Sequence, residues 1–67
     1  MEVIENQIKA LFEKHKSAGK FTKGDKENFR REIIQIVQEN IYQLDNNEIN
    51  KMAVFSSNVI NEFENLT

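Results

Sequence analysis

Apolar residues recur with a helical period along most of the chain and divide it into three segments. In the first segment the spacing alternates between three and four residues, which predicts a helix over about residues 2–18. Gly19 follows at the position of a left-handed C-terminal cap. The apolar stripe of this helix consists of Met1, Ile4, Ile8, Leu11 and His15, with Phe12 beside it.

The second segment begins after a loop. Residues 19–25 contain two glycines and have no apolar period, so we predict a loop in which Phe21 anchors the chain to the core. From Asp25 onward the apolar side chains fall within an arc of roughly 160° on a helical wheel, which predicts a second helix that is buried over a broad face. These side chains are Phe29, Ile33, Ile34, Ile36, Val37, Ile41 and Leu44.

The third segment has the clearest start. Asp45 and Glu48 have the spacing of a capping box, which predicts a helix that begins at Asn46. Its apolar residues keep one phase as far as Leu66, and the small residues Ala53 and Ser56 would let the second and third helices approach closely. We therefore predict one all-α domain over residues 1–67, with the second and third helices in an antiparallel hairpin and the first packed across it.

The broad apolar face of the second helix also predicts a dimer, because it is wider than one neighbouring helix can cover. Asn40 lies within this face, and a single polar residue in an apolar seam fixes the register of a dimer. The alternative is that Asn40 lies at the edge of the arc and reaches solvent. The predicted dimer seam consists of Ile33, Ile36, Val37, Asn40 and Ile41.

Composition limits the chemistry that the chain can perform. The 67 residues include one His and no Cys, so disulfides and thiolate metal sites are excluded. Catalysis needs two groups with separated pKa values or a nucleophile beside a base, and no such set is visible. We therefore expect a protein that is not an enzyme and that has no cofactor and no metal site. His15 is expected to cover the edge of the core at the end of the first helix, and the alternative is that it acts as a general base or a pH switch.

The chain is expected to be soluble and cytoplasmic. Its longest apolar run, residues 52–55, has four residues, against the roughly 20 that a membrane span needs. The absence of Cys fits a reducing cytosol, although many secreted proteins lack Cys too.

Charge is distributed unevenly along the chain. Residues 14–31 contain seven cations and two anions, so they carry +5 within a chain whose net charge is -2. The cations of this basic corner are Lys14, Lys16, Lys20, Lys23, Lys26, Arg30 and Arg31. The corner is either a solvated loop with ordinary lysines or a surface that contacts phosphate, nucleic acid or an acidic protein patch. In the second case Arg30 and Arg31 would make the contacts, because guanidinium groups bind phosphate and carboxylate bidentately.

Residues 44–49, followed by Phe55-Ser56-Ser57 and Ile60, resemble the helix-turn-helix of phage repressors of the Cro type. The resemblance implies DNA binding, with residues 56–58 at the start of a recognition helix and Ile60 and Phe63 on its core side. The sequence departs from the family at Val54, where Gly is usual, and at Asn50, where a small residue is usual. The apolar stripe also stays in phase across the supposed turn, which favours one continuous helix.

The outer face of the third helix supplies the candidate binding surface. Its side chains form a nearly uncharged strip, which is more typical of an interface than of a solvent face. The predicted partner-binding residues are Asn50, Val54, Ser57, Asn58 and Asn61 of this strip, with Tyr42, Arg30 and Arg31. We predict a small non-enzymatic regulator, inhibitor or adaptor of bacterial or phage type that binds a larger protein. The alternative is a DNA-binding protein that uses the basic corner or the helix-turn-helix at residues 44–66.

Overall fold

The computed structural model describes residues 2–66, and these residues fold into three α-helices and one 3-10 turn. The elements are α1 (Glu2–Ser17), α2 (Lys23–Asn40), η1 (Ile41–Gln43) and α3 (Asn46–Glu64). The predicted all-α class is confirmed, since no strand occurs within residues 2–66. Met1, which the sequence places in the first apolar stripe, lies outside the described residues.

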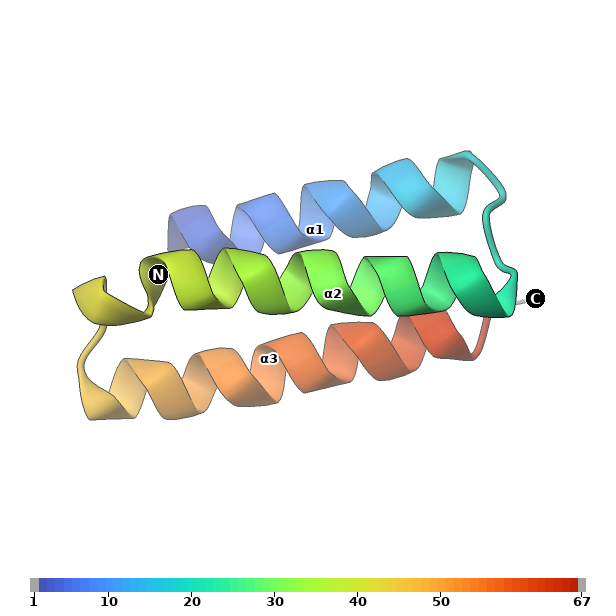
Figure 1. Ribbon diagram of the computed structural model, residues 1–67. Coiled ribbons are helices and arrows are strands. Elements are labelled where there is room, and N and C mark those ends of the chain that lie inside the picture. Colours follow the sequence, from blue (N-terminus) through green and yellow to red (C-terminus); the bar gives the residue numbers. More distant parts are fainter. Residues whose placement is uncertain (1, 67) are drawn as a thin grey trace.

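The three α-helices lie side by side in an elongated bundle of 35 × 16 × 15 Å. Each of them contacts both of the others. The connection between α1 and α2 lies at one end of the bundle, and the connection through η1 to α3 lies at the other end (Figure 1). None of the helices within residues 2–66 combines the length and the apolar character needed to cross a membrane.

Two of the predicted helix boundaries are confirmed by their caps. Gly19 has a φ of +66°, and its N–H donates to the carbonyl of Lys16 at the end of α1. At the start of α3 the carboxylate of Asp45 accepts from the N–H of Glu48 at 2.8 Å, and the Glu48 carboxylate accepts in return from the N–H of Asp45 at 3.1 Å. The capping box that predicted a start at Asn46 is therefore present.

The bounds of α2 differ from the prediction at both ends. α2 begins at Lys23 rather than Asp25, because Thr22 and Asp25 form a second capping box. The Thr22 hydroxyl oxygen accepts from the N–H of Asp25 at 3.1 Å, and that hydroxyl donates to the Asp25 carboxylate at 2.7 Å. At the other end α2 stops at Asn40 and the chain tightens into η1. The apolar stripe that predicted the second helix continues to Ile41 and Leu44 and so extends past the end of α2.

The core is centred on the inner faces of all three helices, and an aromatic cluster fills part of it. Phe12 and His15 of α1 lie edge-on to Phe29 and Phe63, which come from α2 and α3. Phe21 packs 5.8 Å from Phe63, which confirms its predicted role as an anchor of the loop. The buried apolar residues are Ile4, Ile8, Phe12, Phe29, Ile33, Met52 and Phe63.

Candidate functional site

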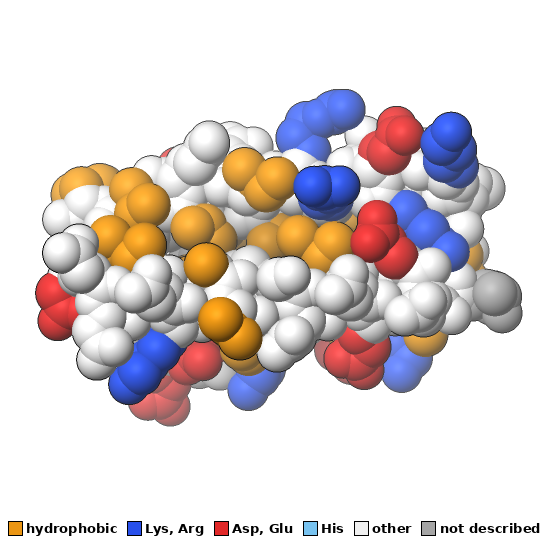
Figure 2. Space-filling model, turned by 90° about the horizontal axis from the view of Figure 1, so that it is seen from below, with side chains coloured by type: hydrophobic (Ala, Val, Ile, Leu, Met, Phe, Trp, Pro, Cys, Tyr) orange, Lys and Arg blue, Asp and Glu red, His pale blue; other side chains and the backbone are white. Residues whose placement is uncertain are grey.

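An apolar groove of about 370 Å³ runs between α2 and α3 on the outside of the bundle. Ile34, 42% exposed, lines this groove together with the partly buried Val37 and Ile60. Figure 2 shows a row of hydrophobic side chains along this face, with basic and acidic side chains gathered toward one end of the row. The remaining lining residues are Arg30, Ile33, Gln38, Ala53, Ser56, Ser57, Asn61 and Glu64.

The polar atoms of the groove are only partly satisfied. Ser56 is 8% exposed, and its hydroxyl oxygen is buried without a hydrogen-bond partner among residues 2–66. Arg30 and Glu64 line the same groove from opposite helices, and within the described chain neither the guanidinium nor the carboxylate forms an ion pair or a hydrogen bond. The groove thus combines an apolar floor with an exposed guanidinium and an exposed carboxylate, which can bind groups of another molecule.

The predicted strip on α3 does not form one surface, because the structure divides it between two hollows. Ser57 and Asn61 line the α2–α3 groove. Asn50, Val54 and Asn58 instead line a shallower depression of about 480 Å³ on the side of α3 that faces α1, together with Glu5, Lys51 and Phe55. Val54 is 61% exposed in this second hollow, which we call the Val54 depression.

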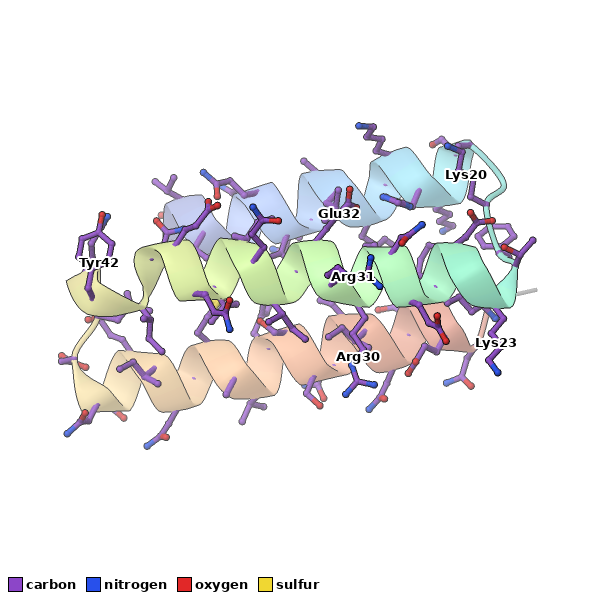
Figure 3. The ribbon with its side chains drawn as sticks, in the orientation of Figure 1. Lys20, Lys23, Arg30, Arg31, Glu32 and Tyr42 are labelled. Atoms are coloured by element: carbon purple, nitrogen blue, oxygen red, sulfur yellow. The ribbon has the colours of Figure 1, made fainter. Side chains whose placement is uncertain are left out.

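Tyr42 and Arg31 lie apart from both hollows. Tyr42 is 79% exposed on η1, and its hydroxyl accepts a hydrogen bond from the Gln43 amide. Figure 3 places it at the opposite end of the molecule from Lys20 and Lys23. Arg31 lies on the front of α2 in the same view, where its guanidinium donates to Asn28 at 3.4 Å.

The cations of the basic corner spread around one end of the bundle instead of forming a compact patch. Arg30 extends toward α3 while Arg31 lies over α2 (Figure 3). The Lys26 ammonium donates to the backbone carbonyl of Glu64, and the Lys16 ammonium lies 5.8 Å from the centre of the Phe12 ring. The predicted phosphate-binding residues Arg30 and Arg31 line one open depression on α2 with Glu27 and Ile34, whereas Arg30 alone of the two also lines the α2–α3 groove.

The residues predicted for a dimer seam also differ in exposure. Ile33 is completely buried within the single chain, so it is not available to a second copy. Ile36 and Val37 are partly buried against the core, whereas Ile41 remains exposed. The Asn40 amide donates to the carbonyl of Ile36 at 2.7 Å, so it serves the end of its own helix. Of the predicted seam, Val37 lines the α2–α3 groove and Ile41 is exposed, so these two side chains are the ones open to a second copy.

His15 is the one imidazole of the chain, and its surroundings are mostly aromatic. Its side chain is 13% exposed, its Nε2 lies 2.8 Å from Oε2 of Glu32, and its Nδ1 is buried without a partner among the described residues. Figure 3 shows Glu32 on the side of α2 next to α1. The contact joins these two helices, as expected for a ring that covers the edge of the core.

The hydrogen bond from the Thr22 hydroxyl is the main cause that lowers the pKa of Asp25 below its ordinary value of 3.8. Within residues 2–66 no three His, Asp or Glu side chains gather where they could hold a metal ion.

The path of α3 bears directly on the helix-turn-helix resemblance. α3 is continuous from Asn46 to Glu64, and Val54 lies inside it with no positive φ. A helix-turn-helix at residues 44–66 would need a turn near Val54, so this interpretation of the sequence is wrong. The prediction of one continuous helix is confirmed.

Comparison of the chain with protein families, with curated proteins and with solved structures gave no match.

Proposed function

We propose that the chain is a small non-enzymatic interaction module, a regulator, inhibitor or adaptor of bacterial or phage type that acts in the cytoplasm by binding a larger protein. The observation that supports this proposal is the Val54 depression. Val54, which is 61% exposed, and the partly buried Phe55 line this one hollow, so their apolar surface is gathered where a partner can cover it and is not scattered singly.

The composition of the depression fits a protein partner better than a charged polymer. Asn50 and Asn58 lie on either side of Val54, and Phe55 contributes an aromatic surface with the Lys9 ammonium 5.8 Å from its ring centre. Aromatic and apolar centres with a polar border are typical of protein interfaces. Tyr42 offers a second exposed aromatic side chain at the η1 end of the bundle.

Site-specific photocrosslinking tests the proposal. A benzoylphenylalanine at position 54 should crosslink one discrete larger protein in the native cell lysate, whereas the same residue at the exposed position Gln7 on α1 should not. Val54→Glu should abolish co-purification of that protein. Val3→Glu makes the same change at a side chain that is 69% exposed on α1, and it should leave co-purification intact. Equal capture by wild type and Val54→Glu would contradict the proposal.

DNA binding through the basic corner is the competing prediction, and it has its own measurement. Binding to phosphates releases counterions, so its affinity must fall steeply with salt and must weaken in Arg30→Ala or Arg31→Ala. Fluorescence anisotropy with duplex DNA at two salt concentrations separates the two functions, because a contact made by the Val54 depression tolerates moderate salt. The absence of DNA binding at low salt would eliminate this alternative.

The proposal also includes the arrangement of the helices and the association of two copies. We expect α2 and α3 to act as an antiparallel hairpin with α1 packed across it, and two copies of the chain to associate through α2.

A further inference from the structure

We propose that the groove between α2 and α3 binds a second copy of this chain, with a two-fold axis parallel to the helices. This inference does not depend on the larger partner, because the groove and the Val54 depression lie on different sides of α3.

The groove differs from the other two grooves of the bundle in leaving its middle apolar and uncharged. The groove between α1 and α2 contains Lys14 and Lys20 together with the His15–Glu32 contact. The groove between α1 and α3 contains Lys9, Glu13 and Glu62. In the α2–α3 groove the charged side chains, Arg30 and Glu64, belong to the first half of α2 and the end of α3, so the apolar centre can meet another apolar surface.

Small residues make a close approach possible. Ala53, Ser56 and Ser57 line the α3 side of the groove, so a helix from another molecule can pack closely against α3 there. The buried hydroxyl oxygen of Ser56, which has no partner within residues 2–66, is a polar group that the single chain leaves unsatisfied. The chain itself covers this oxygen, so Ser56 contributes a small, uncharged side chain to the floor of the groove and no polar contact to the second copy.

The charges identify the occupant as a second copy and select the symmetry of the dimer. A two-fold axis parallel to the helices places α2 of one copy opposite α3 of the other, with the same ends together. Arg30 then faces Glu64 of the second copy, and Glu64 faces the second copy's Arg30, so one dimer contains two opposite-charge pairs. A two-fold axis across the helices would instead bring this charged end against the uncharged end of the groove, around Gln38 and Ala53.

Arg30 and Glu64 also have charged neighbours within their own chain, and these could compete for an ion pair with the second copy. Glu27 and Arg31 share a depression with Arg30, and the Lys26 ammonium contacts the backbone carbonyl of Glu64. Neither the Arg30 guanidinium nor the Glu64 carboxylate forms an ion pair with these neighbours among the described residues. Both groups therefore remain available across the interface.

Charge reversal tests this dimer directly. Light scattering after gel filtration should give about twice the 7.9 kDa mass of the chain for the wild type. Arg30→Glu and Glu64→Arg should each raise the dimer dissociation constant by about tenfold or more, because each change creates two like-charge pairs per dimer. The double variant should regain the wild-type constant within about twofold.

A mixture of the two single variants gives the sharpest result. Each variant alone brings like charges together. In a mixed pair the introduced carboxylate of one chain faces the introduced guanidinium of the other, and the two unchanged side chains, Arg30 and Glu64, also face each other. The mixture should therefore form heterodimers under conditions where each variant alone is a monomer. Arg31→Glu, the same reversal at the neighbouring residue outside the groove, is the control and should change the constant by less than about twofold.

Two results would overturn the inference. The first is a wild-type chain that remains a monomer up to about 1 mM. The second is a dimer that neither single reversal weakens, or that the double variant and the mixture fail to restore. Circular dichroism of each variant, which should match the wild type because Arg30 and Glu64 are exposed, shows that the changes act on association and not on folding.

Discussion

The rings of Phe29 and Phe63 stack with their centroids 4.2 Å apart and an interplanar angle of 29°. Phe29 lies in the first half of α2 and Phe63 in the last turn of α3, and both side chains are completely buried. Phe12 and His15 of α1 meet this pair edge-on, so all three helices contribute to one aromatic cluster. The stability of so small a bundle should therefore depend strongly on these rings.

Phe63→Ala should leave the protein largely unfolded. Truncation of a buried Phe to Ala costs about 3–5 kcal/mol, which equals the roughly 3–5 kcal/mol that a core of this size supplies. Far-UV circular dichroism should show the loss of helix. Phe55→Ala is the matched control, because Phe55 is only partly buried on the same helix and should cost clearly less in a urea titration. Native helix content and an unchanged urea midpoint in Phe63→Ala would show that the cluster matters little.

His15 should stabilise the fold through its packing more than through its hydrogen bond to Glu32. His15→Ala removes a ring that is 13% exposed and contacts two Phe rings, so we expect the free energy of unfolding to fall by about 2–3 kcal/mol. Glu32→Gln should change it by less than about 1 kcal/mol, because the Glu32 side chain is half-exposed and its interaction is screened.

His15→Phe separates these two contributions within one position. It keeps the ring and removes the buried Nδ1 that lacks a partner within residues 2–66, so stability should stay within about 1 kcal/mol of the wild type. Urea unfolding of the three variants provides the measurement. If His15→Phe were as destabilised as His15→Ala, the hydrogen bond and not the packing would be the main contribution.

The sequence predicted α3 well because both of its signals are local. The Asp45 and Glu48 side chains satisfy backbone groups three residues apart, and the apolar stripe repeats within one helix. Neither depends on where the other helices lie. The same type of signal, Thr22 with Asp25, was missed at the start of α2, because Gly24 between them suggested a loop and Asp replaces the usual Glu or Gln.

The exposure of the residues predicted for a dimer seam was harder to predict, because it depends on tertiary packing. In this bundle α2 contacts both α1 and α3, so a broad apolar arc is partly used within one chain. Ile33, at the centre of the arc, is completely buried, whereas Ile34, one residue along, is exposed in the groove. A helical wheel gives the angle between these residues, but it does not show which angles the neighbouring helices cover.

The candidate binding surface shows the same limit. Ser57 and Asn58 are adjacent on the predicted strip, yet they line different hollows because a helix turns by about 100° per residue. Arg30 and Arg31 share a depression on α2, yet only Arg30 also extends to the α2–α3 groove (Figure 3). Residue types on the surface could be predicted from the sequence, whereas their grouping required the positions of all three helices.

The Thr22–Asp25 capping box should make stability depend on pH in the acidic range. Because the pKa of Asp25 is lower in the folded protein than its ordinary value of 3.8, the ionised carboxylate stabilises the fold above that value. This contribution is lost as the pH falls through the folded-state pKa. Asp25→Asn should lower the Tm at pH 7, and the difference from the wild type should shrink toward about pH 2. Glu27→Gln, an exposed neighbour with no capping role, is the control, and a constant Tm difference for Asp25→Asn across this range would contradict the assignment.

The two glycines should respond oppositely to the same substitution. Gly19 has a φ of +66°, and a Cβ there would meet no atom within 4 Å, so Gly19→Ala is disfavoured by backbone strain alone and should cost about 1–2 kcal/mol. Gly24 lies inside α2 with only the Thr22 hydroxyl oxygen at 4.0 Å. Gly24→Ala should therefore stabilise the protein by about 0.5–1 kcal/mol, because alanine loses less backbone entropy in a helix. Urea midpoints should move in opposite directions for the two variants, and a shift of the same sign in both would show that α1 does not end, or α2 does not begin, where the structure places them.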